Sequence, residues 1–229
     1  DRRYLDRAHS VSAFLLGDFP RIRRAGPGRC FAYTSLDKRR VHNANLLAVE
    51  HILRTAARTG DAEALPEVQP ALEFSLSAQR EDGAWPYGVC DEDEPYEPAL
   101  MRLVDHHHTG FVLRSLHGIH MAAPSTVMFE ALKAGYRFYK TLILPGGMPV
   151  NGNGAWPVDI HACAEGVLCN SVLSPSLPGA LAKAVLVLRW SHYHLRNPRD
   201  GAPWHRKYPF FKSRMVFPRW GVAWMYRAL

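Results

Sequence analysis

Cysteine is scarce in this sequence. The chain of 229 residues has four cysteines, Cys30, Cys90, Cys163 and Cys169, and none of them forms a Cys-x-x-Cys pair. A chain of this size does not depend on disulfides, and this spacing is not that of a structural zinc site. We therefore expect free thiols, a reducing cytoplasmic setting and no metal centre.

Long apolar runs and nucleotide-binding motifs are also missing. No run approaches the roughly 20 apolar residues of a membrane helix, and DRRYLDRAHS at the start is neither a signal nor a transit peptide. No Gly-x-Ser-x-Gly, Walker or Gly-x-Gly-x-x-Gly motif occurs, and no nucleic-acid-binding module is recognisable. We expect a soluble protein with no transmembrane segment, no cofactor and no nucleic-acid partner.

Charge is present in excess and is unevenly distributed. The formal net charge is +7, with seven Lys and Arg residues within 21–40 and seven more within 196–219, while an acidic stretch runs through 82–97. Such polarity suits an anionic ligand, and by charge alone this could be a nucleic acid, a nucleotide or an acidic sugar. The alternative is a solvated surface of mixed charge.

Helical periodicity is the strongest positive signal. Apolar residues recur at helical spacing in several segments, and in 42–58 they place Leu46, Leu47, Val49, Ile52 and Leu53 on one face. Ser125 is a good N-cap for one of the later segments. The predicted helices are 42–58, 70–79, 105–122, 125–143, 159–173, 179–195 and 219–229.

These helices form a repeat of pairs. The first helices of the pairs begin near His42, Asp105, Asp159 and Arg219, at separations of 63, 54 and 60 residues. An aromatic, Gly-rich loop follows each pair: GAWP at 83–86, GAWP again at 154–157, and GAPW at 201–204. Because one pair cannot bury its apolar face alone, successive pairs stack. We predict an all-α fold, a single α/α-toroid domain over 1–229 that is an incomplete (α/α)6 barrel lacking N-terminal helix pairs.

The first loop carries a family resemblance. Gln79, Gly83 and Trp85 fit the Gln-x-x-x-Gly-x-Trp core of squalene and other terpenoid cyclases, whereas the catalytic Asp-x-Asp-Asp of those enzymes has no good match; DEDE at 91–94 is the nearest string. From about residue 18 to the end, the order HNANLL, QREDGAWPYG, DHHHTGFVL, FYKTLILPGGMP, WPVDIHACAE, HRKYPFF and RWGVAWM resembles the terpenoid-cyclase-like α/α-toroid proteins of bacterial polysaccharide gene clusters. The resemblance implies a toroid and a carbohydrate setting. Related toroids include uronyl epimerases, polysaccharide lyases and unsaturated-uronyl hydrolases.

In toroids of this kind the N-termini of the inner helices face a central cleft, and helix N-termini favour anions. The polar residues that open the repeats are therefore candidate site residues. We expect catalytic roles for His108, His161, Tyr208, Asp105 and Asp159, and substrate binding by His42, Asn43, Asn45, His107, Trp156, Arg206, Arg219 and Trp220. The competing interpretations are helix capping for Asp105 and Asp159 and packing for Trp156.

The leading hypothesis is an enzyme that acts on an acidic, uronate-containing polysaccharide. A base and an acid drawn from His108, His161 and Tyr208 would move the proton next to the uronate carboxylate, giving epimerisation or β-elimination. Arg206, Arg219 and Asn45 would hold that carboxylate, and Trp156 and Trp220 would stack on sugar rings.

Three alternatives remain open at this point. A glycoside hydrolase would use Asp105 and Asp159 as its carboxylate pair. A non-catalytic protein would bind the glycan as a scaffold of a polysaccharide-assembly complex. Terpenoid cyclisation is the most remote, because the helix openings are polar.

Overall fold

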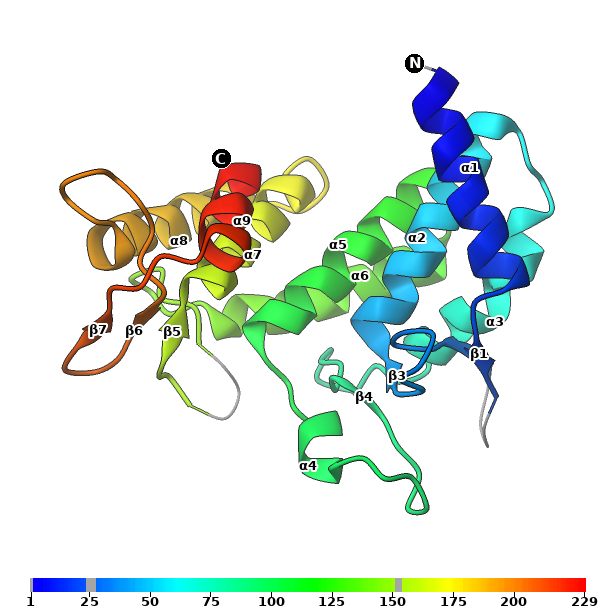
Figure 1. Ribbon diagram of the computed structural model, residues 1–229, viewed down its shortest axis with the longest axis horizontal. Helices are drawn as coiled ribbons and strands as arrows, with labels where there is room; N and C mark the ends of the chain where they lie inside the picture. The colour runs from blue at the N-terminus through cyan, green and yellow to red at the C-terminus, as the bar shows by residue number, and fades with distance from the viewer. Residues whose placement is uncertain (1, 24–27, 151–153) are drawn as a thin grey trace. The chain divides into compact units, whose positions relative to one another are not determined.

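The structure is a computed structural model that describes residues 2–23, 28–150 and 154–229 (Figure 1). It divides into two compact units, one made of residues 1–103 with 115–135 and the other of residues 104–114 with 136–229. Helices α5 (His106–Ala122) and α6 (Thr126–Tyr139) contribute residues to both units. The single domain over 1–229 stays a prediction.

The N-terminal unit is built on helices α2 and α3, which pack together, and α1 packs on α2. Two short antiparallel ribbons join the helices, β1 with β2 and β3 with β4. The bounds are α1 Arg2–Gly17, β1 Arg21–Ile22, β2 Cys30–Phe31, β3 Arg40–Val41, α2 His42–Thr59, α3 Ala64–Leu76, β4 Gly88–Val89 and α4 Pro98–Met101.

The C-terminal unit is centred on α7, which packs against both α8 and α9. A three-stranded antiparallel sheet of order β5-β6-β7 lies beside these helices. The bounds are η1 Lys140–Leu142, β5 Val158–Asp159, α7 Ile160–Leu173, α8 Ala180–Leu195, β6 Arg206–Lys207, β7 Lys212–Ser213, the π-helical turn η2 Pro218–Val222 and α9 Ala223–Ala228.

The helices follow the predicted segments, with differences that have local causes. Leu46, Val49, Ile52 and Leu53 are buried as expected, but Leu47 is 39% exposed because it lies about 100° around the helix from Leu46. Helix α3 begins at Ala64 rather than at residue 70, since Pro70 is accommodated inside the helix. Ser125 caps α6 through its Oγ, which accepts from the Met128 N–H at 3.4 Å. Helix α1 was not predicted although its apolar residues recur at helical spacing, and the two-residue strands were not predicted because they are too short to show a period.

The Gln-x-x-x-Gly-x-Trp turn has a clear structural role. Gln79 Nε2 donates to the carbonyl oxygens of Gly83 and Ala131, both at 3.0 Å, and so ties the loop to α6. Trp85 is buried and donates from Nε1 to the Ser75 carbonyl at 2.8 Å. Gly83 has a φ of 91°, and a Cβ there would collide with the Ala134 carbonyl. The motif therefore fastens the end of one helix pair to α6, the second helix of the following pair.

This geometry predicts a large stability loss for Gly83→Ala. The substitution combines a left-handed backbone, which costs an L-residue about 1–2 kcal/mol, with overpacking of about 1–3 kcal/mol. Gly60→Ala is the matched control, because Gly60 has a φ of 75° but nothing within 4 Å of a Cβ. Urea unfolding followed by circular dichroism should show Gly83→Ala to be about 2 kcal/mol worse than Gly60→Ala. Equal losses of unfolding free energy in the two variants would mean that a Cβ at Gly83 does not clash with α6.

Helix α7 is buried around most of its circumference and carries a buried ion pair. Glu165 is fully buried, and Arg114 of α5 donates to it twice, from Nε at 2.7 Å and from Nη2 at 3.0 Å. Burial raises the pKa of Glu165, against the opposing effect of Arg114. Within the residues that the structure describes, no helix combines the length and apolar character needed to cross a bilayer.

Candidate functional site

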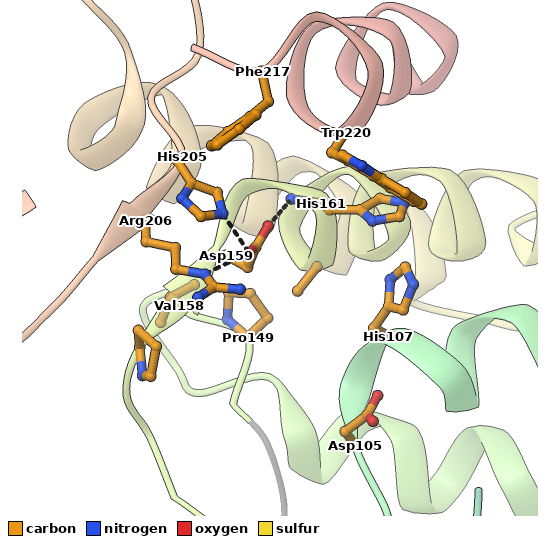
Figure 2. A pocket seen from close by; sticks show the side chains of 12 residues that line it. Asp105, His107, Pro149, Val158, Asp159, His161, His205, Arg206, Phe217 and Trp220 are labelled. Carbon is orange, nitrogen blue, oxygen red and sulfur yellow. Dashed lines mark hydrogen bonds and ion pairs between the residues drawn. The ribbon is translucent and has the colours of Figure 1, made fainter. Parts of the chain in front are cut away.

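A cavity of about 400 Å³ opens in the C-terminal unit (Figure 2). It lies where β5 enters α7, with the first turn of α5, the start of β6 and the π-helical turn η2 around it. Its lining contains two carboxylates, three imidazoles and one guanidinium. The lining residues are Asp105, His107, Pro149, Pro157, Val158, Asp159, His161, Ala162, His205, Arg206, Phe217 and Trp220.

Asp159 organises one side of the cavity. The register of β5 and β6 pairs Asp159 with Arg206, so Arg206 Nε reaches Asp159 Oδ2 at 2.7 Å. His205 Nε2 lies 3.3 Å from the same oxygen, and Asp159 Oδ1 accepts from the His161 N–H at 2.8 Å as the N-cap of α7. The hydrogen bond to Asp159 raises the pKa of Arg206, and Tyr208 adds to this effect. The side therefore presents a fixed cation held by a capping carboxylate.

Two histidines form the other side. The rings of His107 and His161 lie 4.1 Å apart between centroids, and both line the cavity. Burial, helped by the nearby His161 and His108, lowers the pKa of His107 to about 2. Burial also lowers the pKa of His161 to about 4, despite the opposing charge of Asp159. Both imidazoles are therefore neutral at pH 7, and His107 Nδ1 and His161 Nε2 have no hydrogen-bond partner among the described residues.

Aromatic rings hold this histidine pair in place. His161 lies 4.8 Å from the ring of Trp224 and 5.5 Å from that of Trp220. Phe111 contacts both His107, at 5.0 Å, and Trp224, at 5.4 Å. Such packing restricts the orientation of both imidazoles.

Asp105, at the start of α5, is held in position by His108. Its Oδ1 accepts from the His108 N–H at 2.7 Å, which makes it the cap of α5, and its Oδ2 pairs with His108 Nδ1 at 2.5 Å. Burial alone would raise the pKa of Asp105, but the hydrogen bond and charge of His108 outweigh burial and lower it. Asp105 is therefore held as a carboxylate.

Of the residues predicted for the site, six line the cavity and others do not. Asp105, His107, Asp159, His161, Arg206 and Trp220 line it. His108 lies behind Asp105, Arg219 is placed over the ring of Trp220 at 5.0 Å, and Tyr208 stacks on Phe211 at 4.3 Å. Trp156 is partly exposed beside Lys207, whose Nζ is 5.1 Å from the ring centroid.

The three predicted residues at the start of α2 belong to the N-terminal unit. His42 is buried, and its Nδ1 lies 3.1 Å from Ser75 Oγ. Asn45 is also buried, where it accepts from the Phe31 N–H and donates to the Ala71 carbonyl and to Ser75 Oγ. The Oδ1 of Asn43 is buried without a partner among the described residues. In this unit, His42 and Asn45 join α2 to α3.

Three further residues belong to the site beyond those to which a catalytic or substrate-binding role was assigned above. His205 and Phe217 line the cavity, and Trp224 packs on His161. The string HRKYPFF contains His205, and the opening RWGVAW contains Trp224, so the signal was their place beside predicted residues. No group of three or more His, Cys, Asp or Glu residues in the described part of the chain is arranged to hold a metal ion.

Comparisons with known proteins fall into two groups. No protein-family model matches the sequence, and no curated protein matches it. Solved structures do match: a cellobiose 2-epimerase from Bacillus thermoamylovorans superposes with a TM-score of 0.69 at 10% identity, over 100% of this chain and 65% of that one. The chain has an α/α-toroid fold.

Two other toroids extend the comparison. An inactive variant of an α-1,6-mannanase from Salegentibacter, in complex with α-1,6-mannotetrose, gives a TM-score of 0.71 at 12% identity over 98% of this chain and 62% of that one. A variant of UGL with dGlcA-Glc-Rha-Glc gives a TM-score of 0.64 at 16% identity, over 98% of this chain and 66% of that one. The toroid neighbours are thus carbohydrate-active enzymes, and this chain spans about two thirds or less of their length.

Proposed function

We propose that this toroid is a carbohydrate-active enzyme that acts on a uronate-containing polysaccharide, by removing the proton next to the uronate carboxylate. The observation that carries the proposal is the pairing, in one cavity, of two neutral histidines with the guanidinium of Arg206. Neutral imidazoles accept protons, and a fixed cation stabilises the negative charge that develops on a carboxylate when its α-proton leaves.

The roles of the individual residues follow from their positions. Arg206 commits Nε to Asp159 and also interacts with Tyr208, and because a guanidinium has five N–H donors we expect the others to bind the uronate carboxylate. His161 takes the C5 proton as the base, and His107 beside it restrains its ring. The arriving carboxylate raises the pKa of His161, because a nearby negative charge favours the imidazolium. Trp220 offers an apolar face for the sugar ring.

Removal of the C5 proton leaves a carbanion that is stabilised by the adjacent carboxylate. This intermediate can react in two ways. Return of a proton to the opposite face of C5 gives the epimer. Departure of the C4 oxygen, protonated as it leaves, gives a 4,5-unsaturated uronate and a shorter chain. The candidate acids that donate this proton are His205 and Tyr208, and Tyr208 also interacts with Arg206. His108 would contribute indirectly, through its contact with Asp105.

Glycoside hydrolysis is the second candidate, because both Asp105 and Asp159 line the cavity. Hydrolysis needs one carboxyl group that is protonated and can donate to the leaving oxygen. Asp105 instead has a lowered pKa, and both oxygens of Asp159 accept hydrogen bonds or pair with cations. These contacts favour proton abstraction over hydrolysis.

The test is incubation of the chain with oligomers of galacturonate, glucuronate, mannuronate and guluronate in deuterium oxide, followed by proton NMR. Deuterium at C5 without cleavage would support epimerisation, and new vinylic signals would support elimination. New reducing ends without either signal would indicate hydrolysis and would assign catalysis to Asp105 and Asp159. Saturable binding without any product would support the scaffold alternative and contradict the proposal.

The setting of this activity is also part of the proposal. We propose a cytoplasmic protein of bacterial polysaccharide biosynthesis, related to the terpenoid-cyclase-like toroids and acting within an assembly complex. The four cysteines are all free thiols, and the Gln79 turn fits the motif shared with those toroids; both support this setting.

A further inference from the structure

The hairpin formed by β6 and β7 ends in an exposed apolar turn. Tyr208 to Phe211 connect the strands, and the Tyr208 N–H donates to the Phe211 carbonyl at 2.9 Å, with Pro209 presetting the backbone of the turn (Figure 1). Phe210 is 98% exposed and Phe211 is 61% exposed. Apolar surface of this kind at the end of a hairpin marks an interaction site.

Three basic residues lie along the hairpin that carries this apolar turn. Lys207 Nζ donates to the carbonyl oxygens of Tyr208 at 2.6 Å and Pro209 at 3.2 Å, which places its charge at the turn. Lys212 Nζ and the Arg214 guanidinium lie over the ring of Trp204, at 5.3 and 5.2 Å. In the part of the chain that the structure describes, none of these three cations has a carboxylate as an ion-pair partner.

The crowding of cations is unfavourable in the free protein. Burial, together with the like charges of Lys207 and Arg214, lowers the pKa of Lys212. A partner that brings negative charge to the hairpin relieves this repulsion. A partner that also accepts two phenyl rings must offer an apolar layer beneath its charged surface.

We propose that the β6–β7 hairpin docks the protein on an anionic lipid bilayer, with Phe210 and Phe211 inserted at the interface and Lys207, Lys212 and Arg214 against the lipid headgroups. Phenyl rings bind readily at a membrane interface, and basic residues near it are attracted to acidic lipids. A glycan is the less suitable partner, because Phe210 has no polar atom with which to orient a sugar hydroxyl. The inference goes beyond the proposed function and does not depend on it.

The test is co-sedimentation of the 229-residue chain with large vesicles of phosphatidylcholine alone or with about 30% phosphatidylglycerol, whose acidic headgroups give the vesicles a negative surface potential. We expect binding to the acidic vesicles only, reduced by added salt. Lys212→Gln with Arg214→Gln should weaken binding about 25-fold, since each cation contributes about fivefold. Phe210→Ser should weaken it about tenfold.

Matched controls are available in the same unit. Tyr226→Ser removes an aromatic ring that is 84% exposed on α9, and Lys183→Gln removes a cation on α8; both should leave vesicle binding unchanged. Failure of the chain to sediment with acidic vesicles would overturn the proposal. So would binding of a soluble polyuronate oligomer that Lys212→Gln with Arg214→Gln weakens as strongly as vesicle binding, while Phe210→Ser weakens neither, because the hairpin would then be a glycan site.

Discussion

His161→Gln should reduce the rate of C5 proton exchange by about three orders of magnitude, within the range that a positioned general base contributes. The base acts in the transition state, so kcat and kcat/KM should fall together while KM stays nearly the same. Proton NMR in deuterium oxide measures this rate directly. His192→Gln is the matched control, because His192 is an exposed histidine on α8.

A second substitution separates binding from chemistry. Arg206→Gln should raise KM and also lower kcat, since Arg206 is expected to hold the substrate carboxylate in the ground state and to bind it more strongly in the transition state, where negative charge develops on it. Circular dichroism should first show that each variant is folded, because Asp159 would lose its ion-pair partner in Arg206→Gln. An exchange rate in His161→Gln within twofold of the unchanged protein would assign the base to another residue.

This protein should unfold in acid at a higher pH than it would if only its carboxylates titrated. Burial lowers the pKa of four histidines in the described part of the chain to between about 2 and about 4. These are His42, His106, His107 and His161, and in the unfolded chain each would titrate near pH 6.5. Between these values the unfolded state binds more protons, so stability falls as pH falls below about 6.5.

The expected effect is large. Each histidine contributes a slope of about 1.4 kcal/mol per pH unit, so four give about 5 kcal/mol per unit, which would exhaust a typical stability near pH 5. Glu165 acts in the opposite direction, because burial raises its pKa. Urea unfolding at pH 7.5, 6.5 and 5.5 measures the slope. His106→Phe should reduce the slope of the free energy of unfolding against pH by about a quarter, whereas His192→Phe should leave it unchanged. A slope below about 1.4 kcal/mol per pH unit, the value for uptake of a single proton, would refute the burial argument.

The helices could be predicted from the sequence because apolar periodicity is a local property. Leu46, Val49, Ile52 and Leu53 define the buried face of α2 without knowledge of its partners. Asp105 and Asp159 could likewise be predicted as caps, and the structure makes both of them caps and cavity residues. Local pattern was therefore sufficient to find the carboxylates and the histidines that follow them.

The rest of the site depends on contacts between distant segments. Arg206 was predicted to bind substrate, but its contact with Asp159, like that of His205, comes from a pair of two-residue strands that are too short to show an alternating pattern. Asn45 was predicted to bind substrate from its place at a helix start, whereas its observed bonds to Phe31, Ala71 and Ser75 depend on how α3 and β2 pack on α2. No local signal distinguishes these two environments.

The hydrogen bond from Gln79 to Ala131 bears on the order in which the chain folds during synthesis. It joins residues 52 positions apart within the N-terminal unit, and that unit also takes in residues 115–135. The ribosome releases residues in order, so helices α2 and α3 emerge well before the segment that completes their unit. Until then the loop around Trp85 lacks its anchor on α6, and the nascent chain exposes apolar surface that chaperones bind.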